Sequence, residues 1–192
     1  MTRLRTLTIM LLGALVLSGC TLVPTSNNPS MVRRGQVPFG LLDRTIPGTN
    51  NGRVRFITQP VYIIDASGHL APSSRIVPAP AQLGSVLREL IIGPTDIETA
   101  AGYSSSLPKG LVILDATIKG EIGTINLARS LSTLSRQDQI NAIGQLVYTS
   151  NDVGASKGLI ITVAGVAQLL PRPKGGNVKI ATEADYQSLL NI

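Results

Sequence analysis

Residues 83–94, Leu83-Gly84-Ser85-Val86-Leu87-Arg88-Glu89-Leu90-Ile91-Ile92-Gly93-Pro94, decide how this chain folds. Apolar side chains recur at positions 83, 86, 87, 90 and 91, which is the spacing of one stripe along a helix. Gly93 and Pro94 then end the helix, because proline cannot continue it. The stripe predicts an amphipathic helix packed on a sheet, and the rest of the chain must supply the strands.

A second helix of the same kind is predicted after Ser135. Ser135, followed three residues later by Asp138, resembles a capping box in which Asp takes the place of the usual Glu. Beyond it, Ile140, Ile143 and Val147 fall on one helical face. We expect this face and the apolar stripe of the first helix to pack on the same sheet.

Short runs of apolar and β-branched residues predict the strands. The first run is Val61-Tyr62-Ile63-Ile64, and a turn at residues 65–68 leads to a second extended stretch that ends at Val77. The later predicted strands are 111–119, 122–127, 159–163, 168–170 and 178–180, before a short terminal helix capped by Thr182 and Asp185. This order predicts an α+β fold, with two helices packed on one face of a mostly antiparallel sheet.

The N-terminal end of the chain is predicted to be a secretory signal. Arg3 and Arg5 precede an apolar stretch from Leu7 to Leu17, and Leu17-Ser18-Gly19-Cys20 is similar to the lipobox of bacterial lipoproteins. We expect residues 1–19 to be removed as the signal peptide and Cys20 to carry acyl chains such as palmitate. The alternatives are an uncleaved membrane helix, for which the apolar run is short against ~30 Å of hydrocarbon, and an ordinary signal with an incidental cysteine. We therefore expect an exported protein, anchored by membrane lipid to the outer face of the cell membrane.

Residues 20–52 are expected to form the lipid anchor and a flexible basic linker, and residues 53–192 one domain. The linker is rich in Ser, Thr, Asn, Pro and Gly. The net charge of +6 comes from the N-terminal part, because residues 56–192 hold ten basic and ten acidic residues. Only six aromatic residues and an exported location argue against nucleic acid as a partner. The linker arginines either meet anionic lipid or wall polymers, or only keep the linker solvated.

The residues give little sign of catalysis or of a bound cofactor. His69 is the only histidine, and acylated Cys20 would leave no free thiol for a metal site. Ser106-Leu107-Pro108-Lys109 fits the S-x-x-K nucleophile motif, but the strand that follows Gly110 leaves no helix to position Ser and Lys. No glycine-rich phosphate loop is present. We expect no enzyme, no metal and no cofactor, and a carboxylate pair such as Asp115 and Glu121 is the one open route to hydrolysis.

Several short motifs follow one another between Tyr62 and Val166. They are the strand 61–64, Leu87-Arg88-Glu89-Leu90-Ile91-Ile92-Gly93-Pro94-Thr95, the loop 106–110, the hairpin ending Ile125-Asn126-Leu127, Gln145-Leu146-Val147-Tyr148-Thr149 and Val163-Ala164-Gly165. Together they resemble the GerMN domain, which is named for a spore-germination protein and is widespread in bacterial envelope lipoproteins. Asp185-Tyr186 is similar to an acidic-aromatic pair that ends actinobacterial members. Asn126 departs from the family pattern, in which an Asp is usual before the Leu.

The resemblance implies a non-enzymatic module that acts by contact with another envelope protein, in envelope assembly or signalling. The residues it singles out are Gly93, Pro94, Gln145, Tyr148, Thr149, Gly165, Asp185 and Tyr186. From the residues alone, Gly93-Pro94 is explained as a helix stop, and Gln145 as a helix residue bonded to a neighbouring loop. The alternative is a binding module for a cell-wall polymer or small ligand, which predicts a polar cleft lined by residues such as Arg88, Gln145 and Tyr148.

Overall fold

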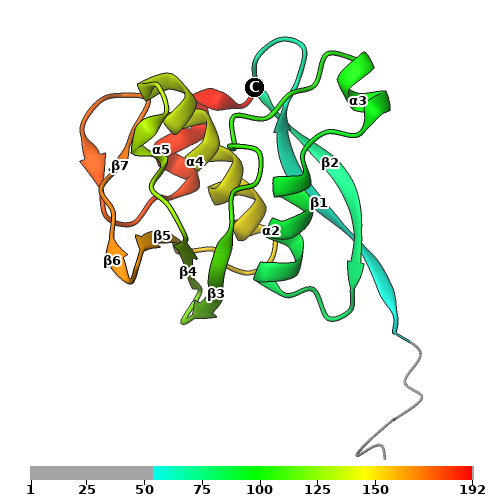
Figure 1. Cartoon of the computed structure of the whole chain (residues 1–192), viewed down its shortest axis with the longest axis horizontal. Coiled ribbons are helices and arrows are strands. Elements are labelled where there is room, and N and C mark those ends of the chain that lie inside the picture. Colours follow the sequence, from blue (N-terminus) through cyan, green and yellow to red (C-terminus); the bar gives the residue numbers. More distant parts are fainter. Residues whose placement is uncertain (1–53, 192) are drawn as a thin grey trace, which may run out of the picture. The chain divides into compact units, whose positions relative to one another are not determined.

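A long antiparallel hairpin opens the part of the chain that the computed structural model describes, residues 54–191 (Figure 1). Strand β1 (Phe56–Ile64) pairs with β2 (Leu70–Pro78), from Phe56 opposite Pro78 to Ile64 opposite Leu70. Val61 and Ile63 point inward and are fully buried. The predicted signal peptide, Cys20 and the linker to residue 52 lie outside the described residues.

The first predicted helix is confirmed as α2 (Leu83–Ile92). It buries Leu83, Val86, Leu87 and Leu90, four of the five positions of the predicted stripe, and the fifth, Ile91, is half-buried. Gly93 ends the helix with φ +87°, a conformation that a side chain would disfavour, and its N–H donates to the carbonyl of Leu90. A second, five-residue helix, α3 (Asp96–Ala100), follows directly and is capped by Thr95.

A four-stranded sheet lies beside the hairpin and has the strand order β3-β4-β5-β6. Strands β3 (Ile113–Lys119) and β4 (Ile122–Leu127) form an antiparallel hairpin around Gly120 and Glu121, both at positive φ. Strand β5 (Gly158–Val163) runs parallel to β4, and the short β6 (Val166–Ala167) turns back against β5. The parallel pair requires a crossover, which α4 provides.

Helix α4 (Arg136–Asn151) confirms the second predicted helix. A single 3-10 turn, η3 (Leu131–Thr133), precedes it, and the Oγ of Ser135 accepts a hydrogen bond from the N–H of Asp138 at 3.2 Å. Ile140, Ile143 and Val147 are buried as expected. None of the helices among residues 54–191 has both the length and the apolar character needed to span a bilayer.

The C-terminal elements close the core. Strands β7 (Leu170–Pro171) and β8 (Asn177–Val178) form a small hairpin, and α5 (Glu183–Tyr186) and the 3-10 turn η4 (Gln187–Leu189) follow. Leu190 forms a parallel bridge to Leu70 at the start of β2. The chain therefore ends against the hairpin with which the described part begins.

The α+β class and the mostly antiparallel pairing are confirmed. Helix α2 packs on β3 and α4 on β5, and both helices also contact the β1–β2 hairpin. The strands belong to three separate sheets rather than one, and the β4–β5 pair is parallel. Sequence spacing could not give this division, because it does not specify which strands pair across a crossover.

Candidate functional site

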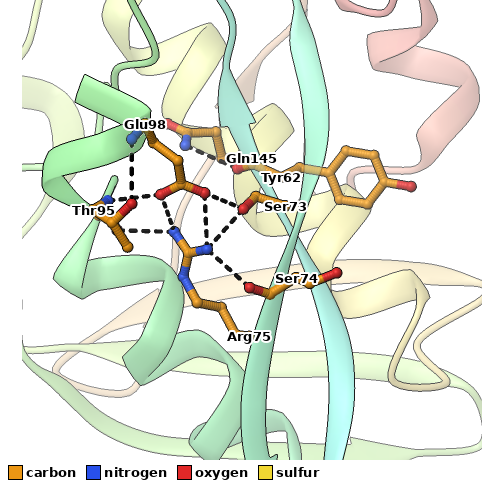
Figure 2. Close-up of polar contacts among 8 residues, drawn as sticks. Tyr62, Ser73, Ser74, Arg75, Thr95, Glu98 and Gln145 are labelled. Atoms are coloured by element: carbon orange, nitrogen blue, oxygen red, sulfur yellow. Dashed lines mark hydrogen bonds and ion pairs between the residues drawn. The ribbon is translucent and has the colours of Figure 1, made fainter. Parts of the chain in front are cut away.

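A polar cluster holds the turn between α2 and α3, where Gly93 and Pro94 lie. Its centre is Arg75 on β2, whose side chain is only 9% exposed. Figure 2 shows the guanidinium reaching both carboxylate oxygens of Glu98, at 3.0 Å from Nη1 and 2.8 Å from Nη2. Nη2 also donates to the carbonyl of Gly93 at 3.1 Å. Arg75 therefore joins β2 to Gly93 at the end of α2 and to Glu98 on α3.

Glu98 also caps its own helix. Its carboxylate accepts the N–H of Thr95 at 2.6 Å, and its N–H donates to the Thr95 hydroxyl at 3.3 Å, which completes a capping box. The Arg75 guanidinium beside the carboxyl lowers the pKa of Glu98 to about 2, although burial acts in the opposite direction. Glu98 therefore stays ionised at any ordinary pH.

Helix α3 depends on this cluster because it has no buried side chain of its own. The hydroxyl of Ser73 on β2 donates to Glu98 and accepts from Arg75. Gly93 and Gly102, both at φ +87°, bracket the segment. The position of α3 is therefore set mainly by polar contacts to β2.

Gln145 and Thr149 on α4 hold the neighbouring backbone. The Gln145 side chain is fully buried; its Nε2 donates to the carbonyl of Tyr62 at 2.9 Å, and its Oε1 accepts the N–H of Ser106 at 2.9 Å. The Thr149 Oγ1 accepts the N–H of Tyr62 at 2.9 Å. The prediction that Gln145 bonds a neighbouring loop is confirmed, and the same side chain also joins that loop to β1.

A hollow of about 510 Å³ lies beside the α2–α3 turn. We call it the α3 hollow. Its walls come from the end of α2, from α3 and from the loop that leads to Lys109, and they are formed by Ile91, Ile92, Gly93, Pro94, Asp96, Thr99, Tyr103, Ser104, Ser105, Leu107 and Lys109. It is the place where two predicted residues, Gly93 and Pro94, meet an open cavity.

The predicted residues Tyr148, Asp185 and Tyr186 lie elsewhere and position α5. The Tyr148 hydroxyl donates to the carbonyl of Glu183 at 3.1 Å, and burial raises the pKa of Tyr148 to about 12. Asp185 accepts hydrogen bonds from the N–H and the hydroxyl of Thr182, at 3.0 and 2.7 Å. Tyr186 is fully buried and donates to a carbonyl in β7 at 2.7 Å. These contacts have a structural role.

Gly165 lies in the turn after β5, at φ +79°, and its contact explains the unusual Asn126. The Asn126 Oδ1 accepts the Gly165 N–H at 3.3 Å and the Thr162 hydroxyl at 3.1 Å. Both contacts need an acceptor and neither needs a charge. An amide oxygen therefore serves here in place of the Asp that the family pattern has.

Arg88, Gln145 and Tyr148 do not line a common cleft. Gln145 is fully buried, while Arg88 is exposed on α2 and donates to the Ser85 hydroxyl. Tyr148 borders a separate pocket of about 200 Å³ with Glu183. The predicted cleft is therefore wrong, and none of these three residues lines the α3 hollow.

The residues considered for catalysis stay apart. Ser106 and Lys109 lie in a loop, as expected, and not on a helix. Asp115 pairs with Asn126, and Lys119 pairs with Ile122 at the turn, so Glu121 lies about 13 Å further along the hairpin. Within residues 54–191 no group of three His, Cys, Asp or Glu side chains is placed to hold a metal ion.

The charge of one carboxyl group affects the pKa of another. Burial raises the pKa of Asp152, although a hydrogen bond with Tyr62 opposes this. Burial and then the charge of Asp152 raise the pKa of Glu183. The sequence did not predict this pair, because Asp152 follows the last residue of α4, Glu183 begins α5, and the two carry no shared motif.

Sequence reasoning also missed the Arg75–Glu98 pair. The two residues are 23 positions apart, and the carboxylates of the chain looked evenly scattered. One signal was available: Thr95 and Glu98 have the spacing of a capping box. Nothing local in the sequence marks Arg75 as its buried partner.

The comparisons with known proteins agree on the fold. Residues 60–168 match the Germane family, described as sporulation and spore germination. No curated protein matches the chain. The first GerMN domain of the sporulation protein GerM from Bacillus subtilis superposes with a TM-score of 0.51 at 15% identity, over 67% of this chain and 99% of that domain. The tandem GerMN domains of the same protein give 0.53 at 14% identity, over 68% of this chain and 48% of theirs, so this chain spans about half of the tandem structure.

Proposed function

We propose that this chain, which belongs to the Germane family of sporulation and spore germination domains, is a lipid-anchored lipoprotein. We propose further that its domain binds another protein of the cell envelope. The family membership carries no partner with it. The proposal therefore rests on one observation in this chain. Ile92 and Ile97, on the α2–α3 surface, are 75% and 83% exposed.

These two isoleucines are well suited to contact a partner. Ile92 ends α2 and Ile97 lies in the first turn of α3, so both project from the segment that Arg75 and Glu98 hold in place. Exposed aliphatic side chains on a rigid support lose little conformational freedom on binding. Large exposed apolar groups that flank a hollow favour a contact surface over a plain solvated one.

The domain acts without catalysis in this proposal. Two observations support the absence of catalysis: Ser106 and Lys109 share no helix, and Asp115 and Glu121 are far apart. Hydrolysis needs a nucleophile, a base and an orienting group brought together. The rival is the pair Asp152 and Glu183. Release of fragments from purified cell wall by the full chain, lost in Glu183→Gln, would overturn the non-catalytic proposal.

Photo-crosslinking tests the contact surface. A photoreactive amino acid at Ile97 should capture one protein in native membranes, and the same group at Val166, 66% exposed on β6, should not. Charged replacement of Ile92 should then abolish the capture at Ile97. Equal capture at positions 97 and 166, or none at either, would contradict this surface.

The anchor is tested separately. Replacing Cys20 with Ala should move the protein from the membrane fraction to the soluble fraction, because the acyl chains would be missing. Intact mass of the wild type should show the acyl groups on a chain that lacks residues 1–19. A Cys20→Ala variant that still sediments with membranes, together with a wild type of unmodified mass, would refute the anchor.

A second candidate function is binding of a cell-wall polymer or a small ligand. The observation that favours it is the α3 hollow, whose volume of about 510 Å³ falls within the usual range of ligand sites.

A further inference from the structure

The α3 hollow has an apolar side and a polar side. Ile91, Pro94 and the buried Leu107 provide the apolar side, and Tyr103 adds a half-buried aromatic ring. An aromatic ring offers a flat apolar face together with a hydroxyl at its edge. A ligand that fills this cavity must itself combine an apolar face with polar groups.

The polar side holds several groups that are free to bind. They are the carboxylate of Asp96, the hydroxyls of Thr99, Tyr103 and Ser104, and the ammonium of Lys109. None of these five side chains makes a hydrogen bond or an ion pair with any other residue in the part of the chain that the structure describes. Five residues that line one cavity therefore carry three hydroxyls, one carboxylate and one ammonium that are not committed to internal partners.

The charges of the lining narrow the class of ligand. Asp96 and Lys109 balance each other, and no other charged residue lines the hollow. Phosphate-rich ligands such as nucleotides need clustered cations, and Lys109 is the one cation among the residues that line this hollow. An uncharged ligand rich in hydroxyls and amides matches it better, because such a ligand can both donate to Asp96 and accept from Lys109.

The cavity is also supported from behind on two sides. Ser105 donates to Gln145 and its hydroxyl accepts the N–H of Leu107, which fixes the loop. Glu98, on the same short helix as Asp96 and Thr99, is held by Arg75. A cavity whose walls are already held in place loses less free energy on binding than one that must first be ordered.

We infer that the α3 hollow binds an uncharged saccharide, with the sugar ring against Tyr103 and its hydroxyl or amide groups shared between Asp96 and Lys109. This inference rests on the second candidate function above and not on the protein partner. N-acetylated amino sugars, which are uncharged and carry both hydroxyls and an amide, fit the lining. The source is either a free oligosaccharide or the glycan of a wall polymer.

Saturation-transfer NMR on the full chain, in a detergent without sugar groups, tests the inference. The probe is chitotetraose, a neutral oligosaccharide of N-acetylglucosamine, and a parallel arm uses purified insoluble cell wall in a pull-down. We expect saturation of the ring and acetyl protons. Binding of both probes would indicate a wall glycan, and binding of chitotetraose alone a free oligosaccharide.

Matched variants locate the site. Asp96→Asn and Lys109→Met should each weaken chitotetraose binding roughly tenfold, because each removes a charged hydrogen-bonding group. Asp115→Asn and Lys119→Met, on exposed positions of β3, should leave binding unchanged. Thermal melts of all four should match the wild type. Absence of saturation transfer to chitotetraose, or binding that survives the Asp96/Lys109 double variant, would overturn the inference, and neither result would bear on crosslinking at Ile97.

Discussion

Neutralising Glu98 should loosen the domain, and Glu98→Gln is the variant that isolates the ion pair. Glutamine keeps an oxygen that can accept the N–H of Thr95, so the helix cap survives. What is lost is the charge facing Arg75, a residue that is 9% exposed and that holds both Glu98 and Gly93. The variant leaves a buried guanidinium without its counter-ion.

The pKa of Glu98 sets an upper limit on the cost. A fall from the ordinary 4.5 to about 2 corresponds to about 3 kcal/mol of unfolding free energy. Solvent at the carboxylate, which is 18% exposed, screens the pair and reduces this value. We expect Glu98→Gln to lower the unfolding free energy by about 1.5–3 kcal/mol at pH 7.

The dependence on pH has a definite sign. A carboxyl whose pKa is lowered by folding adds stability above its unfolded pKa, and that stability is lost as the pH falls through its folded pKa. The difference between wild type and Glu98→Gln should therefore be complete at pH 6, decrease as the pH falls below the ordinary value of 4.5, and be mostly lost by pH 2.

Urea unfolding of the full chain, followed by far-ultraviolet circular dichroism between pH 7 and pH 2.5, measures this directly. The control is Glu121→Gln, whose partner Lys157 is 64% exposed, and it should cause no measurable change. Adding Arg75→Met to Glu98→Gln should recover part of the loss, because the buried unpaired charge is removed. A Glu98→Gln variant as stable as the wild type at pH 7, or a difference as large at pH 2.5 as at pH 7, would refute the reasoning.

Three further changes test the fold by urea unfolding. Gln145→Leu should cost about 2–4 kcal/mol, because it leaves partly buried backbone groups of β1 and of the 104–107 loop unpaired; a loss below 1 kcal/mol would mean that water replaces the amide. Gly102→Ala should cost about 2–3 kcal/mol, since a Cβ there would lie 2.9 Å from that of Ala66, whereas Gly175→Ala, in open space at a similar φ, should cost about 1 kcal/mol; equal losses would show that only φ matters. Leu87→Ala should cost about 2–5 kcal/mol because Leu87 is fully buried. An unchanged midpoint of urea unfolding would show that this face of α2 does not pack in the core.

The parts of the fold that could be predicted are the ones that local sequence controls. The apolar stripe of α2, its stop at Gly93 and the turn at Gly120-Glu121 each depend on residues within one or two turns of the chain. The parallel pairing of β4 with β5 could not be predicted, because it joins residues 36 positions apart across α4. Strand spacing does not distinguish it from an antiparallel return.

The candidate site follows the same division. Gly93 and Pro94 border the α3 hollow, but from the residues alone they could be explained only as the end of a helix. The residues that give the hollow its chemistry, Asp96 and Lys109, come from a short exposed helix and a loop, where no periodic pattern operates. Arg75 looked like one surface cation among many. Its burial becomes visible only once β2 and α3 are side by side.

The bridge between Leu70 and Leu190 constrains when the domain can fold as it emerges from a ribosome or a membrane channel. The β1–β2 and β3–β4 hairpins are local and can form as soon as their strands are free. The core cannot close before residues 186–190 have appeared, because Tyr186 is fully buried within it and Leu190 pairs with the hairpin. A chain that is held just before residue 186 therefore stays incompletely folded, and the domain completes folding only after residue 190 has been released.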